Sequence, residues 1–269
     1  MSNSSKINTP NLGIGTFLLE GNDAYTSVLS ALKTGYRLID TAAVYENEKE
    51  VGKAIKDSNI KRESILLSTK LYAKKIGYNA AIEECKKSLE NLGISYIDIY
   101  FIHWMPRKYE DLLDTWRGLE YLYQHGYCKA IGICNISLFY LDKLLKDAEI
   151  SPMYCQLEIH PFLQQDLFLE YCQAHQIKVI GYGLFAKGLV FKNEKLKNLA
   201  QTANTTIANY VLSWGMSKGV IPLVKSKNPE RIKSNFYDNF ELSSEQMLDI
   251  EKLNDGLRVY RDPENNPYV

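Results

Sequence analysis

Cysteine is scarce in this sequence of 269 residues, and the cysteines it has form no recognisable framework. The five of them are scattered without a CxxC pair or the spacing of a zinc site, at Cys85, Cys128, Cys134, Cys155 and Cys172. Because an odd number argues against a complete set of disulfides, we expect reduced thiols. No cluster of histidine, cysteine and carboxylate residues has metal-ligand spacing, so we expect no metal.

An excess of one charge sign is also missing, since 32 lysines and arginines balance 32 aspartates and glutamates. A neutral chain creates no overall field that attracts nucleic acid or an anionic membrane, and we expect neither as a partner. No stretch reaches the roughly 18 apolar residues that a spanning helix needs. The first ten residues are polar, without the apolar core of a signal peptide, so we expect a cytoplasmic protein.

The sequence contains no linker rich in proline, glycine or serine and no low-complexity run, which favours one domain over residues 1–269. Short β-branched runs instead alternate with amphipathic stretches, as in repeated βα units. The expected strands are residues 12–17, 36–41, 65–70, 97–103, 130–134, 154–158, 178–182 and 220–224. Eight such units predict an α/β fold, a single (β/α)8 TIM barrel.

Two stretches of the sequence show the apolar spacing and end signals that predict helices. Residues 79–92 carry apolar side chains at helical spacing, and Gly93 provides the stop. After the eighth unit, residues 243–254 open with Ser-Ser-Glu-Gln, a cap in front of an apolar stripe, and predict an additional C-terminal helix. The tail from 255 to 269 has an irregular pattern.

Polar side chains gather where the expected strands end. Asp40 lies near the end of the second strand with Tyr45 shortly after it, Lys70 ends the third strand, and His103 ends the fourth. Parallel barrel strands all end on one face, and active sites of this architecture lie there. Each residue alone would more often be a surface, ion-pair or packing residue, but their joint placement favours a site.

These four side chains suit one reaction. A lysine near a phenol favours the phenolate, by about 4 kcal/mol for unit charges about 4 Å apart at an effective dielectric of about 20, so Lys70 would make Tyr45 a usable proton donor. The Asp40 carboxylate can fix Lys70 in its charged form, and His103 can donate to a carbonyl oxygen. Together they predict acid-catalysed reduction of a carbonyl group.

Five motifs in order make the sequence resemble the aldo-keto reductase family from residue 12 to residue 253. They are GYRLIDTAAVYENEKEVG, LSTKL, SLENLGISYIDIYFIHW, QLEIHPFLQQ and KSKNPERIKSN. The resemblance implies a catalytic tetrad of Asp40, Tyr45, Lys70 and His103, with Tyr45 as general acid. It also implies a nicotinamide dinucleotide across the barrel mouth, with contacts at Asn135, Gln156, Tyr182, Gly183, Leu184, Lys225, Ser226, Arg231 and Asn235.

The implied cofactor contacts have a physical rationale. Asn135 and Gln156 are amides that can pair with the nicotinamide carboxamide, and the Tyr182 ring offers a stacking face. Two cations and a hydroxyl lie near the start of a helix that Asn-Pro opens, on Lys225, Arg231 and Ser226. This group suits a 2′-phosphate and therefore predicts NADPH. Without the family context, the same residues read as a solvated basic face, buried amides and core packing.

Two residues depart from the family pattern. Cys134 stands where many relatives have serine, so a thiol, a weaker donor, would replace the hydroxyl contact to the carboxamide. Ser234 replaces the acidic residue that many relatives carry just before Asn235, which removes one expected adenine contact.

The carbonyl pocket is expected to be lined by aromatic side chains that end or follow strands on the same face. Phe17 and Trp104 are the candidate substrate contacts beside Tyr45, although packing at the barrel rim would place them equally well. Short loops resemble the small microbial 2,5-diketo-D-gluconate reductase-like members and predict an open, permissive pocket. We expect a monomer that takes a small-molecule carbonyl substrate.

Two alternatives remain open at this point, and a third reading is rejected. The chain could be a nicotinamide-binding regulatory subunit with little turnover, or Lys70 could form a Schiff base in an aldolase-like barrel. Gly181-x-Gly183-x-x-Ala186 superficially matches the Rossmann fingerprint, but it lies in the seventh βα unit and opens no βαβ half. His160, in EIHP, is interpreted as a structural residue outside the site.

Overall fold

Eight parallel strands close into a barrel in the order in which they occur along the chain. The computed structural model describes residues 8–236 and 241–264. The strands are β1 (Gly13–Gly15), β2 (Leu38–Asp40), β3 (Leu66–Leu71), β4 (Ile97–Ile102), β5 (Cys128–Cys134), β6 (Tyr154–Glu158), β7 (Lys178–Tyr182) and β8 (Val220–Val224). The ring closes where β1 pairs with β8, with Gly13 opposite Leu223. The predicted TIM barrel is confirmed.

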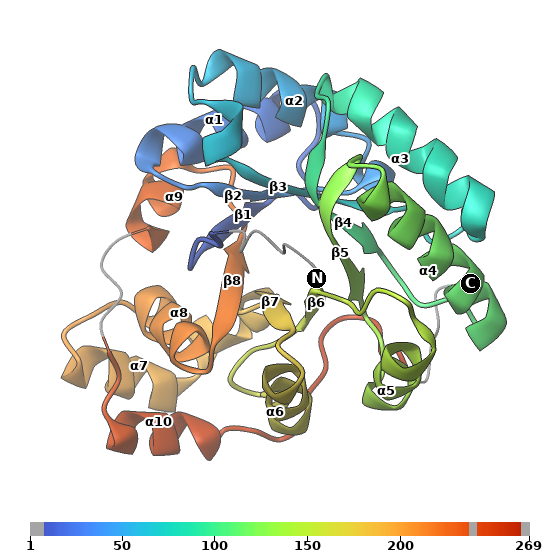
Figure 1. The fold of residues 1–269 in the computed structure, drawn as a ribbon. Coiled ribbons are helices and arrows are strands. Elements are labelled where there is room, and N and C mark those ends of the chain that lie inside the picture. The colour runs from blue at the N-terminus through green and yellow to red at the C-terminus, as the bar shows by residue number, and fades with distance from the viewer. Residues whose placement is uncertain (1–7, 237–240, 265–269) are drawn as a thin grey trace.

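Helices surround the strands, as Figure 1 shows. The helices are α1 (Asn22–Thr34), α2 (Glu48–Asp57), α3 (Tyr78–Leu92), α4 (Tyr109–Gln124), α5 (Leu138–Asp147), α6 (Asp166–Ala174), α7 (Glu194–Thr202), α8 (Ile207–Ser217), α9 (Pro229–Asn235) and α10 (Ser244–Glu251). Short 3-10 helices, η1 (Ala43–Tyr45), η2 (Arg62–Ser64) and η3 (Ala186–Lys192), lie in the connections.

Alternate residues along each strand face two different apolar clusters, because successive strand side chains point to opposite sides of the sheet. Leu38, Ile99 and Phe101 belong to the cluster that fills the barrel. Their neighbours Ile39 and Tyr100 belong to the larger cluster between strands and helices. The barrel is therefore a packed core, and only its rim can hold a substrate.

The helix ends follow the signals in the sequence. Helix α3 ends at Leu92 because Gly93 adopts the left-handed conformation with φ of 64°. The predicted additional helix is confirmed as α10, which Ser243 and Gln246 open with a capping box. The tail after α10 is irregular through residue 264, and residues 265–269 lie outside the described part of the chain.

The predicted strands are confirmed in number and order, and three of them agree at both bounds: β6, β7 and β8. The first strand is shorter than the predicted 12–17, since it ends at Gly15 and leaves Phe17 in the loop that follows. The polar first ten residues can be judged only from residue 8 onward, because residues 1–7 lie outside the described chain.

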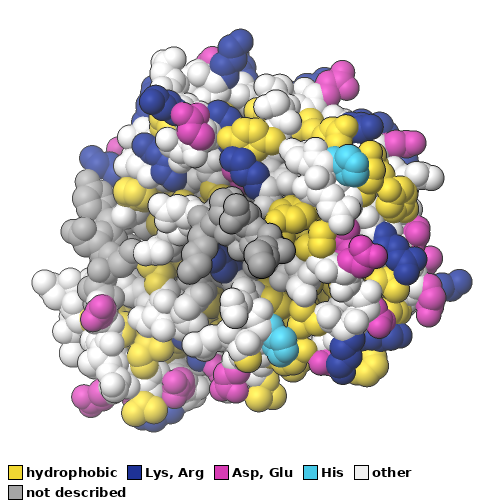
Figure 2. All heavy atoms as spheres, in the orientation of Figure 1, with side chains coloured by type: hydrophobic (Ala, Val, Ile, Leu, Met, Phe, Trp, Pro, Cys, Tyr) yellow, Lys and Arg dark blue, Asp and Glu magenta, His cyan; other side chains and the backbone are white. Residues whose placement is uncertain are grey.

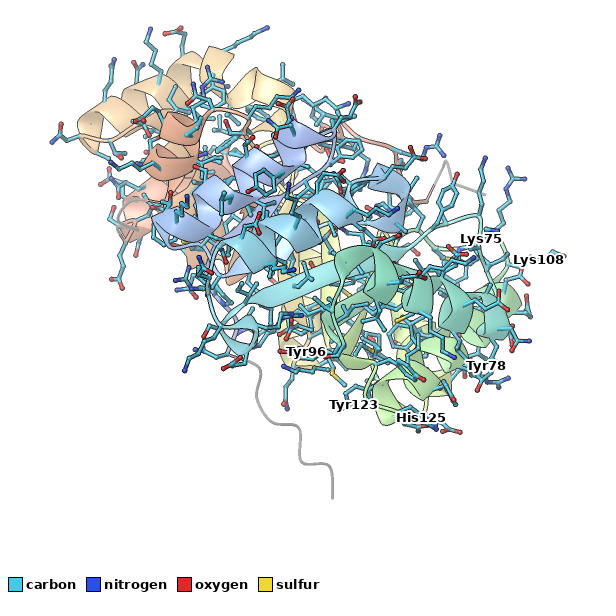
Figure 3. All side chains as sticks on the ribbon, turned by 90° about the horizontal axis from the view of Figure 1, so that it is seen from above. Lys75, Tyr78, Tyr96, Lys108, Tyr123 and His125 are labelled. Carbon is cyan, nitrogen blue, oxygen red and sulfur yellow. The ribbon has the colours of Figure 1, made fainter. Side chains whose placement is uncertain are left out.

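Acidic and basic side chains are interspersed on the face shown in Figure 2, in keeping with the balanced charge of the sequence. Within the described residues, no helix has the length and apolar character needed to span a membrane. Figure 3 shows that Tyr96, which precedes β4, lies well away from Lys75 and Lys108 in the loops that follow β3 and β4. These positions mark the two ends of the barrel.

Candidate active site

The C-terminal ends of the strands bring the predicted site residues to one rim of the barrel. Asp40 is the last residue of β2, Lys70 lies near the end of β3, and His103 directly follows β4. Tyr45 ends the short helix η1 that follows β2. All four therefore lie at the same end of the barrel, because parallel strands in a barrel end on the same side.

A cavity of about 380 Å³ opens at this rim. Its lining includes Phe17, Asp40, Tyr45, His103, Trp104, Asn135, Gln156, Tyr182, Gly183 and Lys225. Both predicted substrate contacts are thus in the cavity wall, and the Phe17 ring lies 5.2 Å from the Tyr45 ring between centroids. The cavity size suits a small organic molecule beside part of a larger ligand.

Asp40 and Lys70 form a buried ion pair beneath the cavity. Lys70 Nζ donates to Asp40 Oδ2 at 2.6 Å and to the main-chain oxygen of Thr41 at 2.8 Å. The other carboxylate oxygen, Oδ1, accepts from Ser68 Oγ at 2.7 Å and from Gln156 Nε2 at 2.8 Å. Both charges are compensated, as burial of an ion pair requires.

Tyr45 lies above this pair with its hydroxyl beside a histidine. Lys70 Nζ is 5.2 Å from the centroid of the Tyr45 ring, and the Tyr45 hydroxyl is 3.4 Å from His103 Nε2. Burial, followed by the charge of Asp40, raises the pKa of Tyr45 well above 10. The lowering expected from Lys70 does not prevail, since Asp40 neutralises much of the lysine's field, and the phenol keeps its proton at neutral pH.

His103 is neutral at neutral pH. Burial, followed by the charge of Lys70, lowers the pKa of its imidazole well below 6.5. A neutral imidazole has one N–H donor and one acceptor. Beside the Tyr45 hydroxyl, it can therefore share a hydrogen-bond network with an oxygen atom of a ligand.

Asn135, Tyr182 and His103 are linked by hydrogen bonds in the cavity wall. Asn135 follows β5 with φ of 54°, a left-handed conformation that asparagine tolerates better than most residues. Its Nδ2 donates to the main-chain oxygen of His103 at 3.0 Å, and its Oδ1 accepts from the Tyr182 hydroxyl at 2.7 Å. The network presents the Tyr182 ring to the cavity, and one N–H of Asn135 stays available to a ligand.

Two residues expected near the cofactor have side chains that do not line the cavity. The Cys134 side chain is fully buried in the cluster that fills the barrel, and the expected contact of its thiol with a carboxamide stays a prediction. Leu184 is also buried, in the outer core, so its side chain faces away from the cavity and only its backbone could reach a cofactor. The inward direction of Cys134 follows from strand alternation along β5.

The predicted phosphate contacts extend from the cavity wall to the start of α9. Ser226 and Arg231 lie there at the surface, after Lys225 on the cavity wall, whereas Asn235 at the end of the helix is buried. The Asn228 side chain accepts from the main-chain N–H groups of Glu230 and Arg231, at 2.8 and 3.2 Å. An anion would therefore have to be held by the side chains, because the cap occupies these N–H groups.

The structure adds residues that the sequence patterns did not reveal. Tyr260 and Arg261, in the tail after α10, line the cavity together with Tyr72. Ser68, two residues before Lys70, bonds to Asp40 as described above. For Ser68 the strand alternation was a usable signal, since residues 68 and 70 point to the same side of β3. The irregular tail carried no comparable signal.

Within residues 8–236 and 241–264, no group of three or more histidine, cysteine or carboxylate side chains could hold a metal ion. The chemistry available at the rim is instead that of a proton donor, a neutral imidazole and a buried ion pair around a cavity. Such a site can protonate an oxygen atom of a bound ligand.

Comparison with known proteins agrees with this fold. A model of the aldo/keto reductase family matches residues 11–255. The chain therefore belongs to the aldo/keto reductase family and is an oxidoreductase, and members of this family use a nicotinamide cofactor.

Individual relatives are similar over nearly the whole chain. Glyoxal reductase of Bacillus subtilis (strain 168) is 41% identical over 262 residues, which cover 96% of this chain and 94% of that protein. The crystal structure of MGS-M4, an aldo-keto reductase enzyme from a Medee basin deep-sea metagenome library, has a TM-score of 0.94 at 39% identity, covering 97% of each chain. The Bombyx mori aldo-keto reductase in complex with NADP has a TM-score of 0.88 at 28% identity, covering 95% of this chain and 92% of that one.

Proposed function

We propose that this protein reduces small aldehydes and ketones to alcohols with NADPH, and that Tyr45 is the general acid. The observation that carries the proposal is the position of the Tyr45 hydroxyl, 3.4 Å from His103 Nε2, at a cavity floored by Asp40 and Lys70. The glyoxal reductase relative supports α-dicarbonyl compounds such as glyoxal as the substrate class to try first.

Each residue of the tetrad has a distinct part. Tyr45 donates its proton to the carbonyl oxygen as negative charge develops there, and the raised pKa keeps that proton in place until then. His103 binds and orients the carbonyl oxygen. Lys70, held by Asp40 beneath the Tyr45 ring, stabilises the phenolate that remains after the transfer.

The cavity wall fits a nicotinamide group, which would supply the hydride when bound. The Tyr182 ring is exposed to the cavity and would stack on it, while Asn135 and Gln156 each retain hydrogen-bonding capacity for its carboxamide. Lys225, Ser226 and Arg231 would hold the 2′-phosphate of NADPH. The NADP complex of the Bombyx mori relative supports this choice of cofactor.

The assay that tests the function follows loss of the reduced cofactor's absorbance with glyoxal, methylglyoxal, a simple aldehyde and a keto-sugar, using NADPH and NADH in parallel. Replacing Tyr45→Phe should lower kcat by about 10²- to 10⁴-fold, because general acid catalysis contributes that much. The Kd for NADPH should stay within about twofold, since the ring remains in place.

Tyr123→Phe, on the outside of the barrel in α4, provides the matched control, because it also removes one phenolic hydroxyl. We expect this variant to keep the wild-type rate. A Tyr45→Phe enzyme that turns over as fast as the control, at saturating cofactor and aldehyde, would show that the proton comes from another group.

The regulatory-subunit and Schiff-base alternatives predict different results in assays with carbonyl compounds. A regulatory subunit would bind NADPH without oxidising it with any of these carbonyl compounds. A Schiff-base mechanism needs an accessible neutral lysine, whereas Lys70 is fully buried and donates to both Asp40 and Thr41. Borohydride trapping with a carbonyl substrate should therefore leave the mass of the protein unchanged.

A further inference from the structure

The motif EIHP at the end of β6 contains a buried carboxylate that the proposed reaction does not use. The Glu158 side chain is fully shielded from solvent, and the His160 ring lies beside it, with Nε2 at 3.0 Å from Glu158 Oε1. A buried carboxylate is stable only when hydrogen bonds and nearby cations compensate it. The remaining partners of Glu158 come from a part of the chain about a hundred residues away.

Those partners lie in the tail after α10, which Figure 1 shows in red running past β6. The main-chain N–H groups of Val259 and Tyr260 donate to Glu158 Oε1 at 2.7 and 3.3 Å. Arg258 Nη1 is 3.5 Å from Glu158 Oε2. The main-chain oxygen of Phe162 also accepts from the N–H of Leu257, at 3.1 Å. The carboxylate and the tail therefore stabilise each other.

Docking on Glu158 places Tyr260 against the wall of the cavity. The Tyr260 ring meets the Tyr182 ring edge to face, with centroids 5.2 Å apart. Tyr260 also packs on Gly183, where a β-carbon would come within 2.7 Å of the Tyr260 ring, so only glycine fits beneath it. Lys187 Nζ is 4.6 Å from the centroid of the same ring.

The Tyr182 ring is consequently held from two sides. Its hydroxyl donates to Asn135, which in turn donates to the main-chain oxygen of His103. Its ring meets the Tyr260 ring edge to face. Without Tyr260, the hydroxyl bond alone would still allow the ring to rotate or tilt. The tail therefore completes the surface on which we expect the nicotinamide to stack.

We propose that Glu158 is a positioning residue that fastens the tail, residues 255–264, so that Tyr260 holds Tyr182 in the orientation that binds the cofactor. This inference rests on the proposed function for the role of Tyr182. Because Glu158 acts on cofactor binding through the tail, and the proton donor Tyr45 is carried by η1 on another part of the rim, its loss should affect cofactor affinity more than kcat.

The test compares Glu158→Gln with Glu170→Gln, a matched change at an exposed position of α6. Limited trypsin digestion followed by intact-mass measurement reports cleavage after Arg258, in the bond that the Glu158 contacts protect. We expect Glu158→Gln to be cleaved there about tenfold faster than the wild type and Glu170→Gln at the wild-type rate. Fluorescence titration should show an NADPH Kd about tenfold higher, with kcat changed less than about threefold.

Tyr260→Ala separates fastening of the tail from positioning of Tyr182, and it avoids changing a buried charge. It keeps the Glu158 contacts to the main chain, so we expect wild-type cleavage after Arg258 but an NADPH Kd raised about fivefold. Tyr260→Phe keeps the ring and should restore the wild-type affinity. If Glu158→Gln does not fold, this pair of variants decides the positioning role alone.

The outcomes distinguish this inference from the proposed function. Wild-type protein that does not bind NADPH would overturn the proposed function. Wild-type protein that binds NADPH, with unchanged affinity in Glu158→Gln and in Tyr260→Ala, would overturn only the positioning role. Release of the tail in Glu158→Gln without any change in Kd would likewise overturn it.

Discussion

The two ends of the barrel each bury an aspartate against lysine or arginine, but they do so in different surroundings. At the C-terminal end, Asp40 and Lys70 are 5% and 0% exposed, and the pair lies under the cavity. At the N-terminal end, Asp98 pairs with Arg62 at 2.7 Å and with Lys129 at 3.3 Å, and these cations are 20% and 44% exposed.

The difference teaches what each cluster can do. Arg62 and Lys129 both lie over the ring of Tyr96, the residue that Figure 3 shows far from the loops of the opposite end. Solvent screens the two cations, and both interact with the face of the aromatic ring. This cluster therefore contributes to the packing of neighbouring strands. Lys70 is shielded from solvent and pairs with Asp40, and the Tyr45 ring lies 5.2 Å from its Nζ atom. In this architecture the C-terminal end carries chemistry and the N-terminal end carries stability.

The largest expected effect is that of Lys70→Met, which should lower kcat by about 10²- to 10³-fold because it removes the cation beneath Tyr45. It should also lower the free energy of unfolding by about 3–5 kcal/mol, since Asp40 would remain buried without its partner. Steady-state kinetics and urea unfolding measure the two effects. If a folded Lys70→Met enzyme kept the wild-type kcat, the ion pair at the C-terminal end would have no more effect on catalysis than the one at the N-terminal end.

Asp98→Ala is the corresponding change at the other end. It removes both ion pairs and the 3.0 Å hydrogen bond that the main-chain N–H of Leu67 donates to Asp98 Oδ2. We expect a loss of about 1–3 kcal/mol in the free energy of unfolding, with kcat/KM within about twofold of wild type. If kcat/KM fell as it does in Lys70→Met, the N-terminal end would not be a purely stabilising region.

Ser68→Ala should have a smaller effect, confined to the C-terminal end. It removes one of the two hydrogen bonds to Asp40 Oδ1, while Gln156 keeps the other. We expect kcat to fall about three- to tenfold with little change in KM. Ser88→Ala in α3 is the control, because its buried hydroxyl finds no partner among the described residues. Equal kinetics in both variants would argue that Ser68 does not position Asp40.

The smallest expected effect is that of pH on reduction between about 6.5 and 10. Tyr45 must be protonated to act as an acid, and its raised pKa keeps it so up to pH values above 10. His103 stays neutral throughout, because its pKa lies well below 6.5. A plot of kcat/KM against pH should therefore be flat in this window, falling only outside it. An inflection inside the window that disappears in Tyr45→Phe would contradict the raised pKa.

The strand ends were the most predictable part of the molecule. Residues such as Asp40, Lys70 and His103 lie at strand ends, and the rule that parallel strands end together is enough to place them at the same rim. The shorter first strand was missed because Thr16 and Phe17 are residue types that favour strands, although the register with β2 ends at Gly15. Sequence pattern indicates burial but does not show where a hydrogen-bonded ladder stops.

The rest of the site depends on contacts between distant segments. Nothing in the tail sequence indicates that Tyr260 reaches Tyr182. The tail is bound to Glu158 through main-chain N–H groups, and such contacts leave no side-chain motif in the sequence. The direction of Cys134 could have been predicted from alternation along β5, whereas the pKa of Tyr45 could not. The direction of its shift is set by the depth of burial and then by the charge of Asp40, and both depend on how distant segments pack in the folded protein.

Closure of the barrel by β1 and β8 also bears on how the protein is made. Gly15 and Phe17 near the beginning of the chain and Tyr260 and Arg261 near its end line the same cavity. A growing polypeptide on the ribosome therefore cannot complete the pocket until synthesis is nearly finished. Reductase activity should appear only after release of the chain, and no amino-terminal translation fragment should compete for cofactor.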